Sequence, residues 1–425
     1  MTVSVRSTTD ATPAPPEPSG HVVDAARWPD VARRPVARPV RTAAARLLLR
    51  RALDRLPLRV GYADGAPTGH GPLLTLHAPD AFFRRVGADG LIGFGESYMA
   101  GEWDCDDLPA VLTVLASHVG ELVPAPFQRL RPLWTHARPA GQRNTPTGAR
   151  RNIHRHYDLS NDLFATFLDE TLTYSSAVFD VIPASWDALA AAQHRKIDRL
   201  LDLVRAGEGT RLLEIGTGWG ELALRAAARG AEVTTLTLSA QQAELARRRI
   251  RAAGLADRVD VRLCDYRDAT GRYDAVVSVE MIEAVGAEYW SVYFTALRDA
   301  LAPGGRIALQ AITMDHQQML NTAATHTWIS KYVFPGGLIP SRRALEDHAE
   351  SAGLRIVSDL GYGDHYAQTL HLWRERFIAH TDLVTGLGFD TTFQRMWELY
   401  LAYSEAGFRA HRLDVRQILM KEAHR

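Results

Sequence analysis

The segment Arg-Leu-Leu-Glu-Ile-Gly-Thr-Gly-Trp-Gly at residues 211–220 constrains the fold more than any other part of the sequence. An apolar run that contains Glu214 comes first, and Gly216, Gly218 and Gly220 follow at alternate positions. Glycines let the backbone turn tightly here and let a ligand approach it, because no Cβ stands in the way. The segment predicts a strand, a tight ligand-binding turn and then a helix.

The spacing of these glycines narrows the class of ligand. The pattern is GxGxG, whereas a dinucleotide-binding turn has GxGxxG and an acidic residue about 20 positions later, at the end of the next strand. The next expected strand ends in Thr237-Leu238-Ser239, which offers no carboxylate to a nicotinamide ribose. A nucleoside cofactor without a pyrophosphate fits better, and S-adenosylmethionine is the prediction.

Strands and helices alternate from about residue 200 onward. The expected strands are 211–215, 232–238, 259–264, 273–279 and 306–312, and the expected helices are 220–229, 239–253 and 290–301. This alternation is typical of an α/β domain in which helices cover both faces of a parallel sheet. Ligands of such sheets bind beyond the carboxyl ends of the strands. Five polar side chains fall at or just past those ends: Glu214, Thr237, Asp265, Glu283 and Gln310.

The chain upstream of this domain divides by composition. The first 30 residues are rich in Pro, Thr, Ala and Asp and lack the apolar h-region of a secretory signal, and residues 1–40 are predicted to be a disordered lead-in. Residues 41–122 hold short strand-like runs at 58–60, 73–76 and 90–95, which predict a small α+β domain. Prolines among arginines at 123–150 predict a linker, and 151–425 forms the large domain.

A basic helix is expected from Arg41 onward. Nine arginines and one acidic residue lie between positions 33 and 59, and Ala45, Leu48, Leu49, Ala52 and Leu53 follow helical spacing. Such a helix either lies on an anionic membrane surface or packs on a core with a solvated basic face.

Overall composition excludes several classes. Lys+Arg and Asp+Glu both number 49, so net charge gives no argument for nucleic acid. Two cysteines exclude a disulfide scaffold and favour a reducing cytoplasm. No apolar run reaches about 18 residues, so no membrane span is expected. The 16 histidines do not group at ligand spacing except His154 and His156, so no metal site is predicted.

Several further segments carry a resemblance. They are 95–103 (GESYMAGEW), 156–164 (HYDLSNDLF), 173–177 (TYSSA), 279–283 (VEMIE), 331–337 (KYVFPGG) and 405–409 (EAGFR). With the glycine loop, they resemble the cyclopropane-fatty-acyl-phospholipid synthase family, which includes the mycolic acid cyclopropane synthases. The resemblance covers roughly residues 55–425 in order. It implies a Rossmann-like class I methyltransferase sheet with a smaller N-terminal α+β domain, and S-adenosylmethionine as cofactor.

The resemblance also implies cofactor contacts. Tyr174 and Ser175 would close over the methionine part, with Glu214, Gly216 and Gly218 along the strand end and the loop. Thr237 and Gln242 would contact the ribose. Asp265 and Tyr266 would lie by the adenine.

The implied chemistry is methyl transfer to a cis double bond in an acyl chain of a membrane phospholipid. Transfer leaves a carbocation, which aromatic faces such as Tyr174, Tyr366 and Trp373 can stabilise. In the family a bound bicarbonate, held by a Cys, a Glu, a His, an Ile and a Tyr, removes the proton. Here Glu283, Ile312 and Tyr366 match, whereas Ser176 stands for the Cys and Gln310 for the His.

This altered base pocket leaves two products open. Direct proton loss from the new methyl gives a cyclopropane, and a prior hydride shift gives a methylene-branched chain on the way to a 10-methyl fatty acid. The substitutions favour the branched product, which a reductase partner would then reduce. The alternatives are a cofactor- or lipid-binding relative without catalysis and a methyltransferase of a soluble small molecule.

Two expectations concern the membrane. The apolar segment 313–345 predicts the lining of an acyl tunnel, with a helical insertion into the core as the alternative. The enzyme is expected in the cytoplasm, associated peripherally with the membrane, and the sequence does not indicate an oligomeric state.

Overall fold

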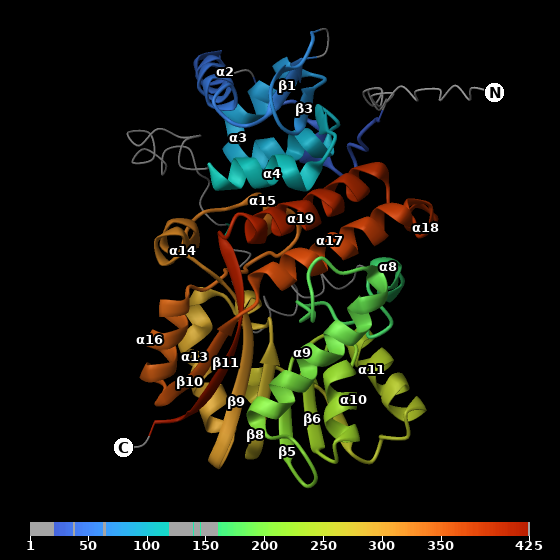
Figure 1. The fold of residues 1–425 in the computed structure, drawn as a ribbon, viewed down its shortest axis with the longest axis vertical. Coiled ribbons are helices and arrows are strands. Elements are labelled where there is room, and N and C mark those ends of the chain that lie inside the picture. The colour runs from blue at the N-terminus through green and yellow to red at the C-terminus, as the bar shows by residue number, and fades with distance from the viewer. Residues whose placement is uncertain are drawn as a thin grey trace, which may run out of the picture.

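The computed structural model describes residues 21–36, 39–62, 65–118, 139, 145 and 160–423. Two sheets form, one of four strands and one of seven. Figure 1 shows the two sheets in opposite halves of the molecule, with the long helices α17 (Gly363–Ala379) and α19 (Thr391–Arg409) between them. Residues 1–20, nearly all of 123–150, and His154 and His156 lie outside the described residues, and the domain boundaries stay predictions.

The N-terminal half is an α+β unit. Its sheet has the order β2-β1-β3-β4, in which β1 pairs parallel with β3 and antiparallel with β2. Its elements are α1 (Pro29–Ala32), α2 (Pro39–Leu53), β1 (Arg59–Tyr62), β2 (Thr68–Gly69), β3 (Leu73–Leu76), α3 (Pro79–Met99), β4 (Trp103–Cys105) and α4 (Leu108–Ser117).

The predicted strand-like run at 90–95 is wrong, because it lies inside helix α3. A short apolar run cannot by itself be assigned to a strand or a helix. Its glycines serve close packing instead. A Cβ on Gly95 would lie 2.4 Å from the Trp328 ring, and one on Gly93 would lie 2.1 Å from the Arg85 carbonyl.

The basic helix α2 packs on α3, as the second reading of its sequence predicts. Arg46 pairs with Asp80 and lies 5.2 Å from the centre of the Phe83 ring. Arg50 lies 4.6 Å from the centre of the Tyr62 ring. Within the described ranges, every helix is too short or too polar for a bilayer span.

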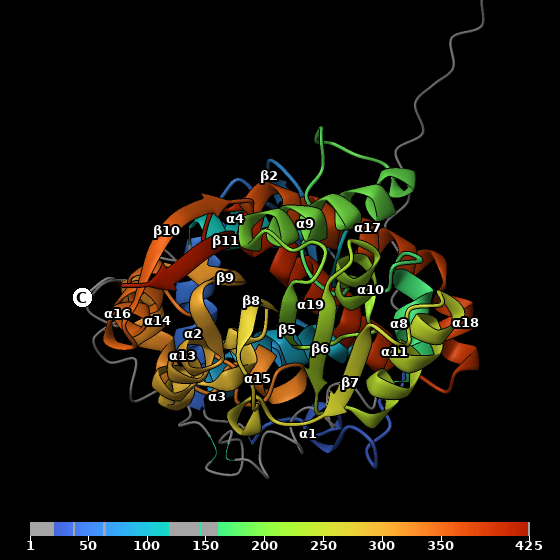
Figure 2. The same cartoon turned by 90° about the horizontal axis from the view of Figure 1, so that it is seen from below.

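The large sheet has the order β10-β11-β9-β8-β5-β6-β7, and Figure 2 shows it from below. The five strands from β9 to β7 are parallel, and β11 pairs antiparallel with both β9 and β10. The strands are β5 (Arg211–Ile215), β6 (Glu232–Thr237), β7 (Val259–Leu263), β8 (Tyr273–Val279), β9 (Leu301–Met314), β10 (Leu354–Gly361) and β11 (Leu413–Glu422). All five expected strands are confirmed, with β9 longer than expected, whereas β10 and β11 were not predicted.

The helices of this half include those expected at 220–229, 239–253 and 290–301. The α-helices are α8 (Asn161–Phe167), α9 (Leu189–Val204), α10 (Glu221–Ala228), α11 (Ala240–Ala252), α12 (Ile282–Val285), α13 (Trp290–Asp299), α14 (His316–Ala323), α15 (Trp328–Tyr332), α16 (Arg342–Ser351), α17, α18 (Thr381–Gly386) and α19. The short 3₁₀ turns are η3 (Trp186–Ala188), η4 (Tyr266–Asp268) and η5 (Ala287–Tyr289).

Alternating side chains of the central strands build two separate cores. Leu212 and Val277 pack with α9, α10 and α11 on one face. Leu213 and Val276 pack with α13 and α16 on the other. Successive strand residues point to opposite faces, so a continuous apolar run is what a doubly covered sheet needs.

Candidate active site

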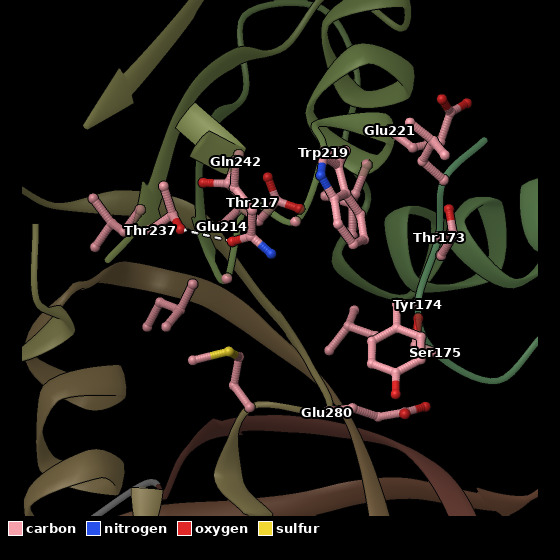
Figure 3. A pocket seen from close by; sticks show the side chains of 18 of the residues that line it. Thr173, Tyr174, Ser175, Glu214, Thr217, Trp219, Glu221, Thr237, Gln242 and Glu280 are labelled. Carbon is pink, nitrogen blue, oxygen red and sulfur yellow. Dashed lines mark hydrogen bonds between the residues drawn. The ribbon is translucent and has the colours of Figure 1, made fainter. Parts of the chain in front are cut away.

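A pocket lies at the carboxyl ends of β5, β6 and β8. Eight of the nine predicted cofactor contacts line it, namely Tyr174, Ser175, Glu214, Gly216, Gly218, Thr237, Gln242 and Tyr266. Figure 3 shows Thr237 and Gln242 on one side of the pocket and Tyr174, Ser175 and Glu280 on the other, with Trp219 between them. The pocket has the open glycine-lined edge that S-adenosylmethionine requires, so these residues fit that cofactor.

The glycine loop has backbone conformations that residues with a side chain rarely adopt. Gly216 has φ 102° and Gly220 has φ 95°. A Cβ on Gly216 would also lie 2.6 Å from Met281 Cγ, whereas one on Gly218 (φ 51°) would meet nothing within 4 Å. The loop therefore turns as predicted and leaves its backbone open to the pocket.

Replacing Gly216 by alanine is expected to weaken S-adenosylmethionine binding at least tenfold. The left-handed backbone costs a residue with a Cβ about 1–2 kcal/mol, and the displaced Met281 side chain would enter the pocket. Calorimetric titration of the cofactor checks this. Gly207→Ala is the matched control, because a Cβ there meets nothing within 4 Å and no positive φ opposes it. Equal affinity in both variants would contradict the prediction.

Hydrogen bonds between polar side chains stabilise the walls of the pocket. Thr237 Oγ1 donates to Gln242 Oε1 at 3.0 Å, which orients the predicted ribose contacts. Glu214 is buried and accepts a 2.6 Å hydrogen bond from Thr235 Oγ1. Burial raises the pKa of Glu214 to about 8. Its carboxyl is therefore mostly protonated at neutral pH before a cofactor cation binds.

Asp265 is the one predicted cofactor contact that does not line the pocket. Its carboxylate accepts from the Arg267 backbone at 3.0 Å, where it caps the short turn η4. The same carboxylate pairs with the Arg267 guanidinium at 2.6 Å. Tyr266, the next residue, does line the pocket.

The predicted anion-binding groups converge on a residue that the prediction did not include. Ser176 N donates to Glu280 Oε1 at 2.9 Å, and Gln310 Nε2 donates to the same oxygen at 2.8 Å. Tyr366 OH donates to Glu280 Oε2 at 2.6 Å. Three of the five predicted groups thus bind the Glu280 carboxylate, which itself lines the pocket of the predicted cofactor contacts.

Glu280 sits directly after β8 with φ 51°. A left-handed backbone is costly for a residue with a side chain and persists mainly where function requires it. Its place just past the carboxyl end of a parallel strand was the signal that could have found it. Glu280 lies in the segment 279–283 that carries part of the family resemblance, but the resemblance predicts only Glu283 of that segment as catalytic.

Glu283 and Ile312 form a second, smaller group. Ile312 N donates to Glu283 Oε1, and within the described part of the chain Glu283 Oε2 has no hydrogen-bond partner. Burial and then the charge of Glu280 raise the pKa of Glu283 to about 8. Burial also raises the pKa of Glu280, but Tyr366, Lys196, Ser176 and Gln310 oppose that shift. The two environments assign the proton to Glu283 and the charge to Glu280.

These contacts do not fit a separately bound bicarbonate. The Glu280 carboxylate takes the hydrogen bonds from Ser176, Gln310 and Tyr366 that the anion would need, and the Ile312 amide is bound to Glu283. A second anion beside Glu280 would also meet its negative charge without those donors.

Aromatic rings surround this end of the site. The Tyr174 ring lies 5.3 Å from Trp373, and Tyr366 lies 6.3 Å from Trp373 in an edge-on arrangement. Tyr174 OH lies 2.7 Å from Tyr400 OH. The three rings predicted to stabilise a cation therefore do form one cluster next to the Glu280 carboxylate.

Comparison with known proteins shows to which family the chain belongs. The sequence model described as mycolic acid cyclopropane synthetase matches residues 144–418. The chain belongs to this family. The resemblance noted in the sequence is thereby confirmed, and the protein is an S-adenosylmethionine-dependent methyltransferase of the mycolic acid cyclopropane synthetase family.

Two relatives of this synthetase-family enzyme are named for different products. It is 56% identical to the tuberculostearic acid methyltransferase of Mycobacterium tuberculosis, over 93% of this chain and 95% of the relative. It is 34% identical to the cyclopropane-fatty-acyl-phospholipid synthase of Escherichia coli, over 80% of this chain and 85% of the relative.

Solved structures confirm the predicted fold class. The structure of a mycolic acid cyclopropane synthase complexed with SAH and CTAB superposes with a TM-score of 0.59 at 29% identity, covering 64% of this chain and 98% of that one. The seven-stranded sheet is therefore the class I methyltransferase sheet that the sequence predicts.

Proposed function

We propose that this enzyme methylates the cis double bond of unsaturated acyl chains in membrane phospholipids and forms a methylene-branched chain. The single observation that carries the product assignment is Glu280, a carboxylate fixed by three donors at the edge of the cofactor pocket. The relative named for tuberculostearic acid supports a methyl-branching reaction, and the Escherichia coli relative supports a phospholipid substrate.

The proposed reaction can be written with the cofactor and the residues of this site. S-adenosylmethionine, when bound, would supply the electrophilic methyl group, and the electron pair of the broken S–CH3 bond would stay on the sulfur of the departing S-adenosylhomocysteine. As the new carbon–carbon bond forms, the alkene loses its π electrons and the other alkene carbon becomes a cation, which the rings of Tyr174, Tyr366 and Trp373 stabilise. A hydride shift moves the cation to the carbon that bears the methyl. Glu280 then accepts a proton from that methyl, and the C–H electron pair forms the double bond of a methylene group (C=CH2) on the chain.

The way Glu280 is held favours the branched product over the ring. Three hydrogen bonds fix the Glu280 carboxylate against the pocket wall. A base that cannot move toward the new methyl removes its proton slowly, so the hydride shift has time to occur first. A bound anion that can move toward the new methyl would instead close the ring directly.

The acyl chain is proposed to reach the site past the segment 313–345. The Phe334 ring lies 5.6 Å from Tyr400, whose hydroxyl contacts Tyr174. The enzyme would then act in the cytoplasm at the membrane surface. The exposed residues Arg51 and Arg55 beside helix α2 are candidates for docking, since Arg46 and Arg50 have partners within their own domain. A reductase would have to convert the methylene product into a methyl branch.

The test incubates oleate-containing phospholipid vesicles with the enzyme and S-adenosylmethionine carrying a trideuterated methyl. We expect an acid that retains two deuterons and co-elutes with a methylene-branched standard. A doubly labelled cyclopropane as the only product would overturn the product assignment. Cofactor binding without any product would indicate a relative without catalysis, and turnover of soluble substrates without vesicles would overturn the lipid assignment.

A further inference from the structure

Lys196 is a buried cation that the chemistry above does not use. Its side chain is 1% exposed in helix α9. Its Nζ donates to Ser175 Oγ at 2.6 Å. Among the described residues that line the pocket, it is the one with a cationic side chain, against the carboxyl groups of Glu214, Glu221 and Glu280.

Helix α9 also holds the backbone of the segment that binds Glu280. Gln193, one turn before Lys196, donates Nε2 to the carbonyl of Ser175 at 2.9 Å and to that of Thr173 at 3.3 Å. The next residue in this segment, Ser176, donates its backbone N–H to Glu280. The contacts from α9 to both the carbonyl and the hydroxyl of Ser175 therefore set the position of one donor to Glu280.

A second connection runs from the same helix through strand β11. Gln417 Nε2 donates to the Lys196 carbonyl at 3.2 Å and to Gln310 Oε1 at 3.0 Å. This bond orients the Gln310 amide so that its Nε2 faces Glu280. Two of the three donors to Glu280 are thus tied to α9 at or next to Lys196.

We propose that Lys196 is a positioning residue that keeps Glu280 ionised as the base, by its positive charge and through Ser175. The inference rests on the proposed function, in which Glu280 accepts the proton. A buried carboxylate needs a counter-charge because desolvation opposes its ionised form.

The charges around both groups agree with this role. Burial lowers the pKa of Lys196 to about 8, against the opposing charges of Glu280, Asp169, Glu214 and Glu221, so Lys196 is still mostly protonated at neutral pH. Among the described residues, the titratable groups that act on Glu280 are Lys196 from α9, Glu283 from α12 and Tyr366 from α17. Of these three, Lys196 is the cation, and Tyr366 contributes a hydrogen bond but no charge.

The test compares the pH dependence of kcat/KM in the full-length enzyme and in Lys196→Met. Activity requires ionised Glu280, so it is lost as pH falls through the pKa of that carboxyl. Without Lys196 that pKa rises, and we expect the acid limb to move upward by about 1–3 pH units. At high pH the variant should regain most of the wild-type rate. Lys196→Arg, which keeps the charge, should leave the acid limb near its wild-type position.

A lysine that only supports the fold would give another result. Activity would then fall by the same factor at every pH, with the acid limb unmoved, and this outcome overturns the inference. Lys196→Gln, which keeps a polar contact with Ser175, takes the place of the methionine variant if that one does not fold. Glu280→Gln measured in the same assay separates the two proposals. If Glu280→Gln is active, the assignment of Glu280 as the base is overturned. If Glu280→Gln is inactive but the acid limb of the pH profile of Lys196→Met is unmoved, only the role of Lys196 is overturned.

Discussion

Replacing Glu280 by glutamine is expected to lower kcat by about 10²–10⁴-fold, the usual contribution of a general base, while the cofactor still binds. Glutamine keeps the size of the side chain and removes the charge that accepts the proton. Single-turnover methyl transfer and calorimetric titration of S-adenosylmethionine measure the two effects separately. Glu170→Gln is the control, because Glu170 is exposed and close in sequence to the pocket-lining segment.

The wild-type pH profile should carry the same signature. Burial raises the pKa of Glu280 above that of an ordinary glutamate. The base form is present above that pKa, so activity should fall as pH decreases and should do so at a higher pH than a solvent-exposed glutamate would give. An acid limb near the ordinary glutamate pKa of about 4.3 would speak against Glu280 as the base.

Glycine at position 280 gives a stricter test of the same residue. The left-handed backbone (φ 51°) favours glycine there, so Glu280→Gly removes the carboxylate without opposing the local conformation. The donors of Ser176, Gln310 and Tyr366 then have no acceptor. Added formate or bicarbonate is expected to restore part of the activity of this variant and to leave the wild type unchanged. Stimulation of the wild type instead would indicate a separate anion site.

Replacing Arg85 by methionine is expected to destabilise the protein by about 3–5 kcal/mol, the cost of leaving a buried carboxylate without its partner. Arg85 is 2% exposed and donates to Glu102 Oε1 at 2.9 Å and to the Val31 carbonyl at 2.6 Å. Its guanidinium also lies 3.9 Å from Glu96, which in turn accepts from Lys331 at 2.6 Å. Loss of Arg85 should therefore weaken the contact between α3 and α15.

Urea unfolding of Arg85→Met against Arg84→Met measures this cost. Arg84 is the adjacent exposed arginine of the same helix, so its loss should change stability by less than about 0.5 kcal/mol. Burial raises the pKa of Glu102 already in the wild type, and loss of Arg85 raises it further. The folded variant is therefore most stable below the pKa of Glu102 and loses stability as the pH rises through it. The difference in the free energy of unfolding between the variant and the wild type should then shrink in acid. If the loss of stability is the same at all pH values, it comes from lost packing alone.

Local pattern was enough to predict the framework of the site. The strand of Leu212 and Leu213, the turn at Gly216 and the helix after Gly220 are set within ten residues, because backbone conformation and burial on two faces leave periodic traces in the sequence. The rule that ligands bind beyond parallel strand ends then placed Glu214 and Thr237 at the pocket, where the structure has them.

The sequence by itself therefore determined the five parallel strands of the large sheet, the glycine turn, the edge where the predicted cofactor contacts lie, and the family. Only the tertiary structure decided what the predicted anion-binding groups bind. Ser176, Gln310 and Tyr366 are 104, 30 and 86 residues from Glu280, and no local period links positions so far apart. The same holds for strand β11, which brings Gln417 to Gln310, and for Arg85, whose partners come from separate segments. Hydrogen bonds and ion pairs in a buried site depend on which elements pack together, and that packing is fixed by the whole fold.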